Sequence, residues 1–121
     1  MSYEVELSIH QEYLRFEVSG ERSLEEAERL FRQIARESAA RNVCKVLLVF
    51  NLRGRISTID IHDLVSKYRE FGLTAKHKIV VVDKNRKTAS DQDFAVNVAR
   101  NRGLNGASFA NEAAALDWLF A

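Results

Sequence analysis

The stretch Val43-Cys44-Lys45-Val46-Leu47-Leu48-Val49-Phe50 is a nearly unbroken apolar run, and Asn51-Leu52-Arg53-Gly54 follows it at once. Its richness in β-branched residues predicts a strand that is covered on both faces, as at the centre of a parallel sheet. Asn42 on one side and Gly54 on the other are typical turn residues that bound it. We therefore expect residues 43–50 to form a central strand, with Cys44 in the core.

Downstream of this strand, helical and strand-like patterns alternate to the end of the chain. Helices placed between strands in this way predict right-handed crossovers and a largely parallel sheet. The expected elements are a helix from Ser57 to about Gly72, a buried strand at 77–82, a helix from Thr88 or Ser90 to Gly103, a short strand at 107–110 and a last helix capped by Asn111.

Upstream, apolar and polar residues alternate over 3–9 and again over 13–19, which predicts a β-hairpin with one wet face. Ser23-Leu24-Glu25-Glu26 then matches a capping box, and apolar residues at helical spacing continue to about Arg41. The predicted order is ββαβαβαβα. The fold class is α/β, with a mostly parallel five-stranded sheet and an antiparallel edge hairpin, in one domain over residues 1–121.

Composition favours a single globular domain and excludes several function classes. The 121 residues suit one domain, and a net charge of +1 gives no electrostatic reason to expect nucleic-acid binding. No apolar run is long enough for a membrane span. The start of the chain shows no basic segment followed by an apolar run, and the one cysteine cannot form an internal disulfide, so we expect a cytoplasmic protein.

No familiar catalytic or metal-binding motif is present, and we expect no cofactor. His10, His62 and His77 fall on a turn, a helix and a strand start, without the spacing that would bring them together on a metal. Ser57, His62 and Asp63 or Asp60 supply the residue types of a hydrolytic triad. However, neighbouring helical residues point roughly 100 degrees apart, so we expect a non-enzyme and keep a weak hydrolase only as a remote alternative.

Cations gather around two of the predicted loops. Arg53 and Arg55 follow the central strand, and Lys84, Arg86 and Lys87 follow the next one. Ligands of open α/β sheets tend to bind beyond the carboxyl ends of the strands, and arginine suits phosphate or carboxylate. The sequence therefore predicts a basic rim that binds an anionic metabolite, a phospholipid headgroup or an acidic partner, unless these are ordinary solvated loop cations.

An apolar residue is expected beside this rim. Ile59 and Ile61 lie two residues apart at the start of the second predicted helix, so they cannot share one helix face. One of them is then exposed near the cations or only partly covered at the edge of the core. Such a spot suits a protein partner, a membrane surface or a lipid-like ligand.

The order of elements and two sequence features carry a family resemblance. The features are the apolar strand before Asn51-Leu52-Arg53-Gly54 and the closing pattern of Phe109 followed by Ala115-Leu116-Asp117-Trp118-Leu119. Together they resemble the STAS group, and within it the small stand-alone SpoIIAA-like proteins, over nearly the whole chain. The resemblance implies a bacterial, cytoplasmic, typically non-enzymatic domain, and the anti-sigma-factor antagonists among these proteins work by switching partners.

The antagonists of this group carry a phosphorylatable serine in an Asp-Ser-Ser-Gly stretch at the start of the second helix. Ile59-Asp60-Ile61-His62 occupies the matching positions here and holds no serine. Ser57 and Thr58 are the nearest hydroxyls and the candidate phosphosites. Both also have a structural explanation, because Ser57 and Asp60 have the spacing of a capping box.

These observations leave two main hypotheses of function. The first is a non-catalytic binding or regulatory module whose site comprises Arg53, Arg55, Ser57, Thr58, Ile59, Lys84, Arg86 and Lys87. The second is a carrier for a lipid or another small anion, with an apolar pocket between the second and third helices. We also expect a homodimer if helices cover only one face of the sheet, because the strands at 43–50 and 77–82 are apolar on both.

Overall fold

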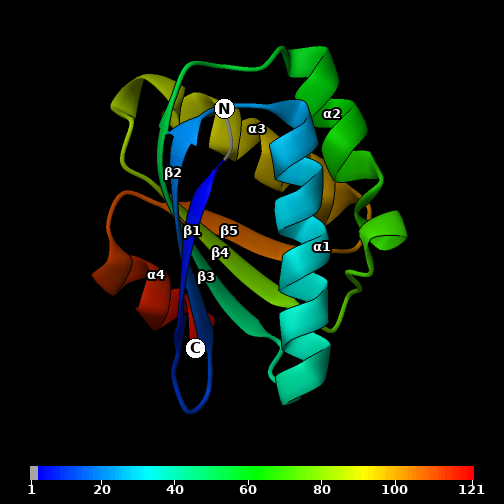
Figure 1. The fold of residues 1–121 in the computed structure, drawn as a ribbon, viewed down its shortest axis with the longest axis vertical. Coiled ribbons are helices and arrows are strands. Elements are labelled where there is room, and N and C mark those ends of the chain that lie inside the picture. Colours follow the sequence, from blue (N-terminus) through cyan, green and yellow to red (C-terminus); the bar gives the residue numbers. More distant parts are fainter. Residues whose placement is uncertain (1–2) are drawn as a thin grey trace.

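The computed structural model describes residues 3–121, apart from the side chain of Arg86. The sheet has five strands in the order β1-β2-β3-β4-β5, so each strand lies beside its predecessor in the chain (Figure 1). β1 and β2 form an antiparallel hairpin and all other pairs are parallel, which confirms the predicted α/β class and sheet type. The strands are β1 (Glu4–Ile9), β2 (Leu14–Glu21), β3 (Lys45–Arg53), β4 (Lys78–Asp83) and β5 (Asn105–Phe109).

Among the described residues, the α-helices follow the predicted order: α1, α2 and α3 connect the parallel strands, together with two short 3-10 turns, and α4 follows β5. Ser23, Ser57 and Asn111 cap three of the helices, each accepting a hydrogen bond from the backbone N–H three residues on. The expected capping serines are therefore confirmed. The helical segments are α1 (Leu24–Arg41), α2 (Thr58–Ser66), η1 (Tyr68–Phe71), η2 (Arg86–Thr88), α3 (Ala89–Asn101) and α4 (Glu112–Leu119).

Both faces of the sheet are covered by helices. One face packs against α1, α2 and α3, and its core includes Phe16, Leu48 and Val81. The other face is covered by α4, which lies across the sheet from α1 (Figure 1) and packs Ala115 and Leu119 on the second core. We expected a homodimer if helices covered only one face of the sheet. Because α4 covers the apolar part of the other face, the homodimer remains a prediction without this support.

The central strand begins and ends later than its sequence pattern indicated. We expected 43–50, whereas β3 runs from Lys45 to Arg53 because β2 extends to Glu21 and pairs with it in parallel, Glu21 opposite Arg53. Arg53 is thus the last residue of a strand and not part of a loop. Cys44 lies just before the strand and is exposed, so its predicted place in the core was wrong.

The second helix is shorter than predicted. α2 ends at Ser66, whose hydroxyl donates to the carbonyl of His62 one turn back, and a 3-10 turn follows. In a 3-10 turn, residues three apart lie on one side, so Tyr68 and Phe71 are both buried. Gly72 then ends the segment at a φ of 99°, where a Cβ would be strained and would also lie only 3.0 Å from the Cβ of Ala35.

Among the described residues, no helix is long and apolar enough to cross a membrane. The same residues contain no group of three or more histidine, cysteine, aspartate or glutamate side chains arranged to hold a metal ion.

An ion pair fixes α4 to the sheet and makes a prediction about pH. Arg15 on β2 donates two hydrogen bonds, of 2.9 and 3.0 Å, to the Glu112 carboxylate at the start of α4. This contact holds the pKa of Glu112 below its ordinary value of 4.5. A carboxylate with a depressed folded-state pKa stabilises the fold above its unfolded pKa, and this contribution is lost as pH falls through the folded pKa.

We therefore expect Glu112→Gln to unfold at a lower urea concentration than the wild type at about pH 7 and at nearly the same concentration at about pH 3. Urea denaturation followed by circular dichroism at both pH values measures this difference. A gap of the same size at both pH values would show that the charge of Glu112 does not stabilise α4.

Candidate functional site

The carboxyl ends of the parallel strands β2, β3 and β4 lie at the same end of the sheet. The β3–α2 loop and the β4–α3 loop begin there. Because β3 and β4 are direct neighbours, the β3–α2 loop and the β4–α3 loop lie side by side, as the basic-rim prediction required. We call residues 53–61 and 84–90 the rim. The rim contains all the predicted site residues.

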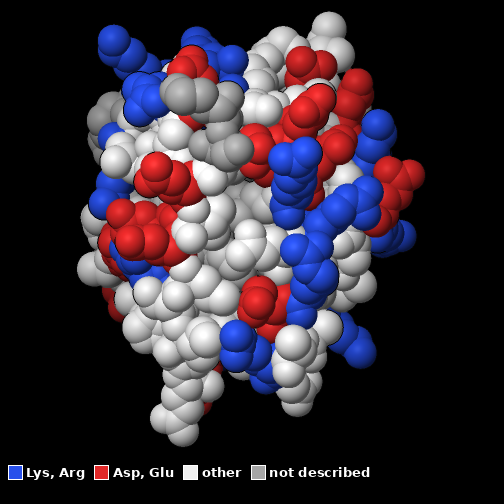
Figure 2. All heavy atoms as spheres, in the orientation of Figure 1, with Lys and Arg blue, Asp and Glu red and all other residues white. Residues whose placement is uncertain are grey.

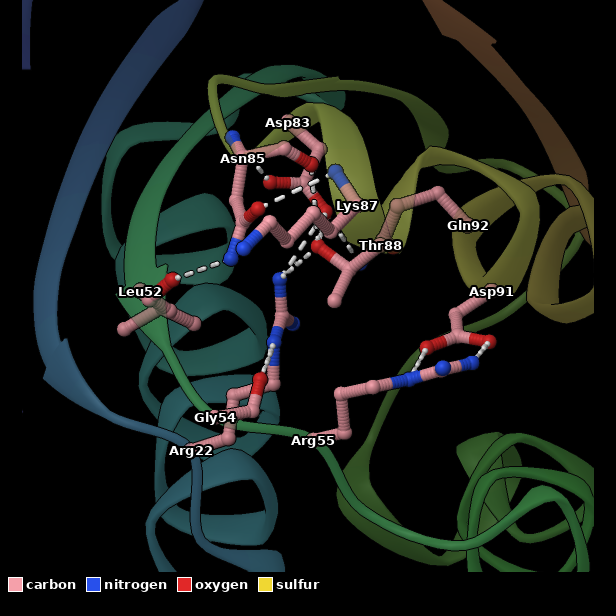
Figure 3. Close-up of polar contacts among 10 residues, drawn as sticks. All are labelled: Arg22, Leu52, Gly54, Arg55, Asp83, Asn85, Lys87, Thr88, Asp91 and Gln92. Atoms are coloured by element: carbon pink, nitrogen blue, oxygen red, sulfur yellow. Dashed lines mark hydrogen bonds and ion pairs between the residues drawn. The ribbon is translucent and has the colours of Figure 1, made fainter.

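A buried carboxylate lies beneath the rim. The Asp83 side chain at the end of β4 is only 3% exposed. Its Oδ2 accepts hydrogen bonds from Arg22 (2.9 Å), Thr88 (2.7 Å) and Gln92 (3.2 Å), and its Oδ1 accepts one from the backbone N–H of Asn85 (2.9 Å) (Figure 3). A buried charge is tolerated only when paired and hydrogen-bonded, and Asp83 is both.

Arg22 is the main residue that the sequence reasoning missed. Its side chain is 9% exposed and donates from Nη2 to Asp83 and to the Thr88 hydroxyl, and from Nε to the carbonyl of Gly54. It therefore joins the end of β2 to both rim loops (Figure 3). Its position just before a helix cap carries no local signal of this role, because its partner lies 61 residues away in the sequence.

Arg55 is not a free cation. Its guanidinium makes two hydrogen bonds, of 2.7 and 3.0 Å, to the carboxylate of Asp91 in the first turn of α3 (Figure 3). This contact raises the pKa of Arg55 and ties the β3–α2 loop to α3. The rim is thus less basic than the sequence suggested, since Asp91 offsets one of its five predicted cations.

The remaining predicted cations are arranged around this frame. Arg53, Lys84 and Lys87 are exposed and form no ion pair with any described residue. The backbone of Arg86 opens η2, but its side chain lies outside the described part of the chain. Three exposed cations therefore remain on the described rim.

The start of α2 supplies the uncharged part of the rim. Ser57 and Thr58 are exposed, and the Ser57 hydroxyl accepts a 3.1 Å hydrogen bond from the N–H of Asp60. Ile59 is 73% exposed, whereas Ile61 is 7% exposed and lies in the core. The prediction that these two isoleucines could not share one face is confirmed, and Ile59 is the exposed one.

The residues of the remote hydrolase alternative do not form a triad. His62 and Asp63 were expected to diverge, yet His62 Nδ1 lies 3.5 Å from an Asp63 carboxylate oxygen, because both side chains are exposed enough to turn toward each other. The other ring nitrogen, Nε2, is 3.4 Å from Arg102, and the Ser57 oxygen is used as a helix cap. No described contact links His62 to Ser57, as a triad needs.

The carrier alternative requires a pocket between α2 and α3. An almost wholly apolar cavity does lie there, between residues such as Val65 and Ala99, but its volume is about 80 Å³. A neighbouring cavity of about 70 Å³ extends toward Arg22 and Tyr3. Sites for drug-sized ligands typically measure about 300–1,000 Å³, so neither cavity has room for a lipid without movement of the helices.

Comparisons with known proteins agree on the architecture. No family model and no curated protein matches the chain. Several solved structures do, among them two that match over nearly the full length of both partners. One is the anti-sigma factor antagonist SpoIIAA in its unphosphorylated form, with 11% identity over 99% of each chain and a TM-score of 0.55. This chain has the SpoIIAA-like fold.

The second structure is an uncharacterised DUF3478-family protein with a SpoIIAA-like fold from Shewanella loihica PV-4. It is 17% identical, the match covers 98% of this chain and 94% of that chain, and the TM-score is 0.54. At such identities the likeness concerns the path of the backbone. It confirms the fold that the sequence resemblance implied, and the roles of individual residues in this SpoIIAA-like chain must be argued from their own contacts.

The Arg22–Asp83 pair makes a prediction about stability. Removing one partner of a buried ion pair leaves the other uncompensated, which typically costs about 3–5 kcal/mol. We expect Arg22→Ala to lose about this much unfolding free energy. The double variant Arg22→Met with Asp83→Asn should lose less than the sum of the losses caused by Arg22→Met alone and Asp83→Asn alone.

Chemical denaturation measures these values, and Arg55→Ala is the matched control. Arg55 is exposed and pairs with Asp91, so its removal should shift the unfolding midpoint far less. Equal losses for the Arg22 and Arg55 variants would contradict a special role for the buried pair.

Proposed function

We propose that the chain is a non-catalytic regulatory module of STAS type that binds a protein partner through the rim. Its contact surface comprises Arg53, Ser57, Thr58, Ile59, Lys84 and Lys87, with Arg55 and the neighbouring Arg86 at the same edge. The SpoIIAA-like fold supports a module of this kind. One protein with this fold is described as an anti-sigma factor antagonist.

The exposure of Ile59 carries the proposal. A large aliphatic side chain that is 73% exposed on the first turn of a helix loses contact with water only when something covers it. Fully burying an isoleucine side chain contributes about 1.5–3 kcal/mol, so covering Ile59 alone would add appreciably to the free energy of binding a partner. Since Ile61 already fixes the helix to the core, the backbone that presents Ile59 need not be ordered at binding, which lowers the entropic cost.

The charges around Ile59 indicate the chemistry of the partner. Arg53, Lys84 and Lys87 are exposed cations, and the buried Arg22–Asp83 pair fixes the loops that carry them. Complementary charge mainly raises the association rate and selects the partner, while apolar burial supplies affinity. We therefore favour a partner that places an apolar pocket inside an acidic surface.

The partner-binding role predicts a selective effect of Ile59→Asp. Aspartate is favourable in the first turn of a helix, so the fold should tolerate it, but it removes the apolar contact and adds a negative charge. In affinity purification from the source organism, the partner recovered with the wild type should be lost with this variant. Phe120→Asp is the control, because Phe120 is 40% exposed just after α4, outside the rim.

Retention of the same protein by the Ile59→Asp variant would place the contact elsewhere. Once the partner is purified, titration calorimetry should give at least tenfold weaker binding for Ile59→Ala, as expected for about 1.4 kcal/mol of lost burial.

Phosphorylation of Ser57 or Thr58 would give this surface a switch. Both hydroxyls are exposed, and a phosphate there would lie at the N-terminus of α2, where a negative charge is favourable. The same phosphate would offset the rim cations and repel an acidic partner.

Tandem mass spectrometry of the chain purified from its source organism tests this switch. We expect a fraction that is heavier by one phosphate group, localised to Ser57 or Thr58. Only unmodified chain, or phosphate on other residues, would contradict it.

A further inference from the structure

A second surface, which shares no residue with the rim, lies along the free edge of the sheet. β1 is an outer strand and pairs only with β2 within the described residues. An outer strand exposes backbone N–H and C=O groups that can pair with an added strand. An extended segment of another protein can join a sheet in this way, with backbone hydrogen bonds giving affinity and side-chain sites giving selectivity.

A groove runs between this edge and α1. It has a volume of about 400 Å³ and combines an apolar floor with charged walls. Val5 and Leu30 are among its apolar residues, and Val5 is partly buried against the main core. The groove is lined by Tyr3, Val5, Glu26, Arg29, Leu30, Arg32, Gln33 and Arg36.

The α1 side of the groove is basic. Arg29, Arg32 and Arg36 recur at helical spacing and so share one face of α1. Arg29 is 72% exposed, and its only ion pair among the described residues is with Glu26. Arg32 donates to the Glu70 carbonyl and lies over the Phe71 ring at 5.0 Å. Neither Arg32 nor Arg36 forms an ion pair with a described residue.

The opposite face of β1 is acidic. Glu4 and Glu6 alternate with Val5 and Leu7, so their carboxylates point away from the α1 side, and Glu17 on β2 lies directly opposite Glu6. Figure 2 shows basic side chains in a band over α1 and acidic side chains beside β1, with uncharged surface between them. The free edge therefore separates two surfaces of opposite sign.

A second copy of the chain fits this edge less well than a separate extended peptide. Joining β1 to β1 about a twofold axis perpendicular to the sheet would bring the Glu4 and Glu6 carboxylates of both copies onto one face, where they repel. A twofold axis in the plane of the sheet would instead set those carboxylates opposite Val5 and Leu7. The second arrangement does bring the added copy's Glu4 and Glu6 to the α1 side, but only by pairing the two β1 strands in parallel, which is slightly less stable per residue than the antiparallel pairing open to a separate peptide.

We infer that the β1 edge binds an extended peptide segment of a partner protein in which acidic and basic residues alternate. Added as a sixth strand, such a segment places its acidic residues toward Arg29, Arg32 and Arg36 and its basic residues toward Glu4 and Glu6. Alternation is required because successive side chains of a strand point to opposite faces of the sheet. Arginine suits the carboxylates, since its planar fork can donate two parallel hydrogen bonds.

Two synthetic peptides of equal composition test the inference. One alternates Glu and Lys at every position, and the other arranges them in pairs, so that each face of an added strand carries both signs. Binding to the full chain is followed by fluorescence anisotropy and by NMR amide shifts. We expect at least tenfold tighter binding of the alternating peptide, with shifts concentrated at 4–9 and 26–36. Equal binding of the two peptides, or no binding of either, would overturn the inference.

Matched variants separate the arginines from general charge. Arg29→Glu with Arg36→Glu should weaken binding of the alternating peptide at least tenfold. Arg41→Glu should leave it unchanged, because Arg41 lies in the last turn of α1 and pairs with Glu37 outside the groove. Circular dichroism confirms that each variant is folded. Equal weakening by both changes would show that only the overall charge matters.

Backbone pairing is tested with peptides methylated on alternate amide nitrogens. One of the two methylation patterns removes the donors that face β1 and should abolish binding, while the other should be tolerated. Binding that survives both patterns would show charge attraction without an added strand and would also overturn the inference. The rim variant Ile59→Asp should bind the alternating peptide normally, so this surface and the proposed function stand or fall separately.

Discussion

The buried carboxylate of Asp83 sets the geometry of the whole carboxyl edge of the sheet. It lies where β4 ends, almost without access to water, and must be matched by donors from the protein. The donors come from the end of β2, the β4–α3 loop, η2 and α3. Because a buried charge that loses a donor is costly, these four segments cannot move independently. A connection that could have been a flexible loop is therefore held in one arrangement.

The same constraint reaches the exposed surface. Arg22 satisfies Asp83 and also donates to the Gly54 carbonyl, so it fixes the start of the β3–α2 loop. Arg55 then joins that loop to Asp91 on α3. With the start of the loop held at Gly54 and Arg55 and its end capped by Ser57, α2 turns Ile61 into the core and leaves Ile59 outside. The exposed isoleucine thus follows from the buried pair and need not be a packing defect.

The sequence predicted the elements well because hydrophobic periodicity and capping residues are local signals. Every strand and α-helix was anticipated, and so was the exposure of one of the two isoleucines Ile59 and Ile61, although not which one. Errors arose where a feature of the structure depends on residues that are distant in the sequence. The length of β3 depends on how far β2 accompanies it to Glu21, and the charge of the rim depends on Asp91, which lies 36 residues from Arg55. The pairing of Arg22 with Asp83 was invisible for the same reason.

The two outer strands of the sheet differ in a way that bears on their use. At β5, Arg100 donates a 2.7 Å hydrogen bond to the Gly106 carbonyl, and the Ser108 hydroxyl is bound by Asp93, so side chains of α3 already occupy that edge. At β1 the charged residues lie to either side of the backbone, on the acidic face and on α1, and leave a groove between them. Charge on an edge strand protects it from indiscriminate pairing, since most added strands would meet like charges or bury unpaired ones. The same arrangement admits a strand whose charges alternate in the matching order, so protection against aggregation and selectivity for a partner arise from one pattern of residues.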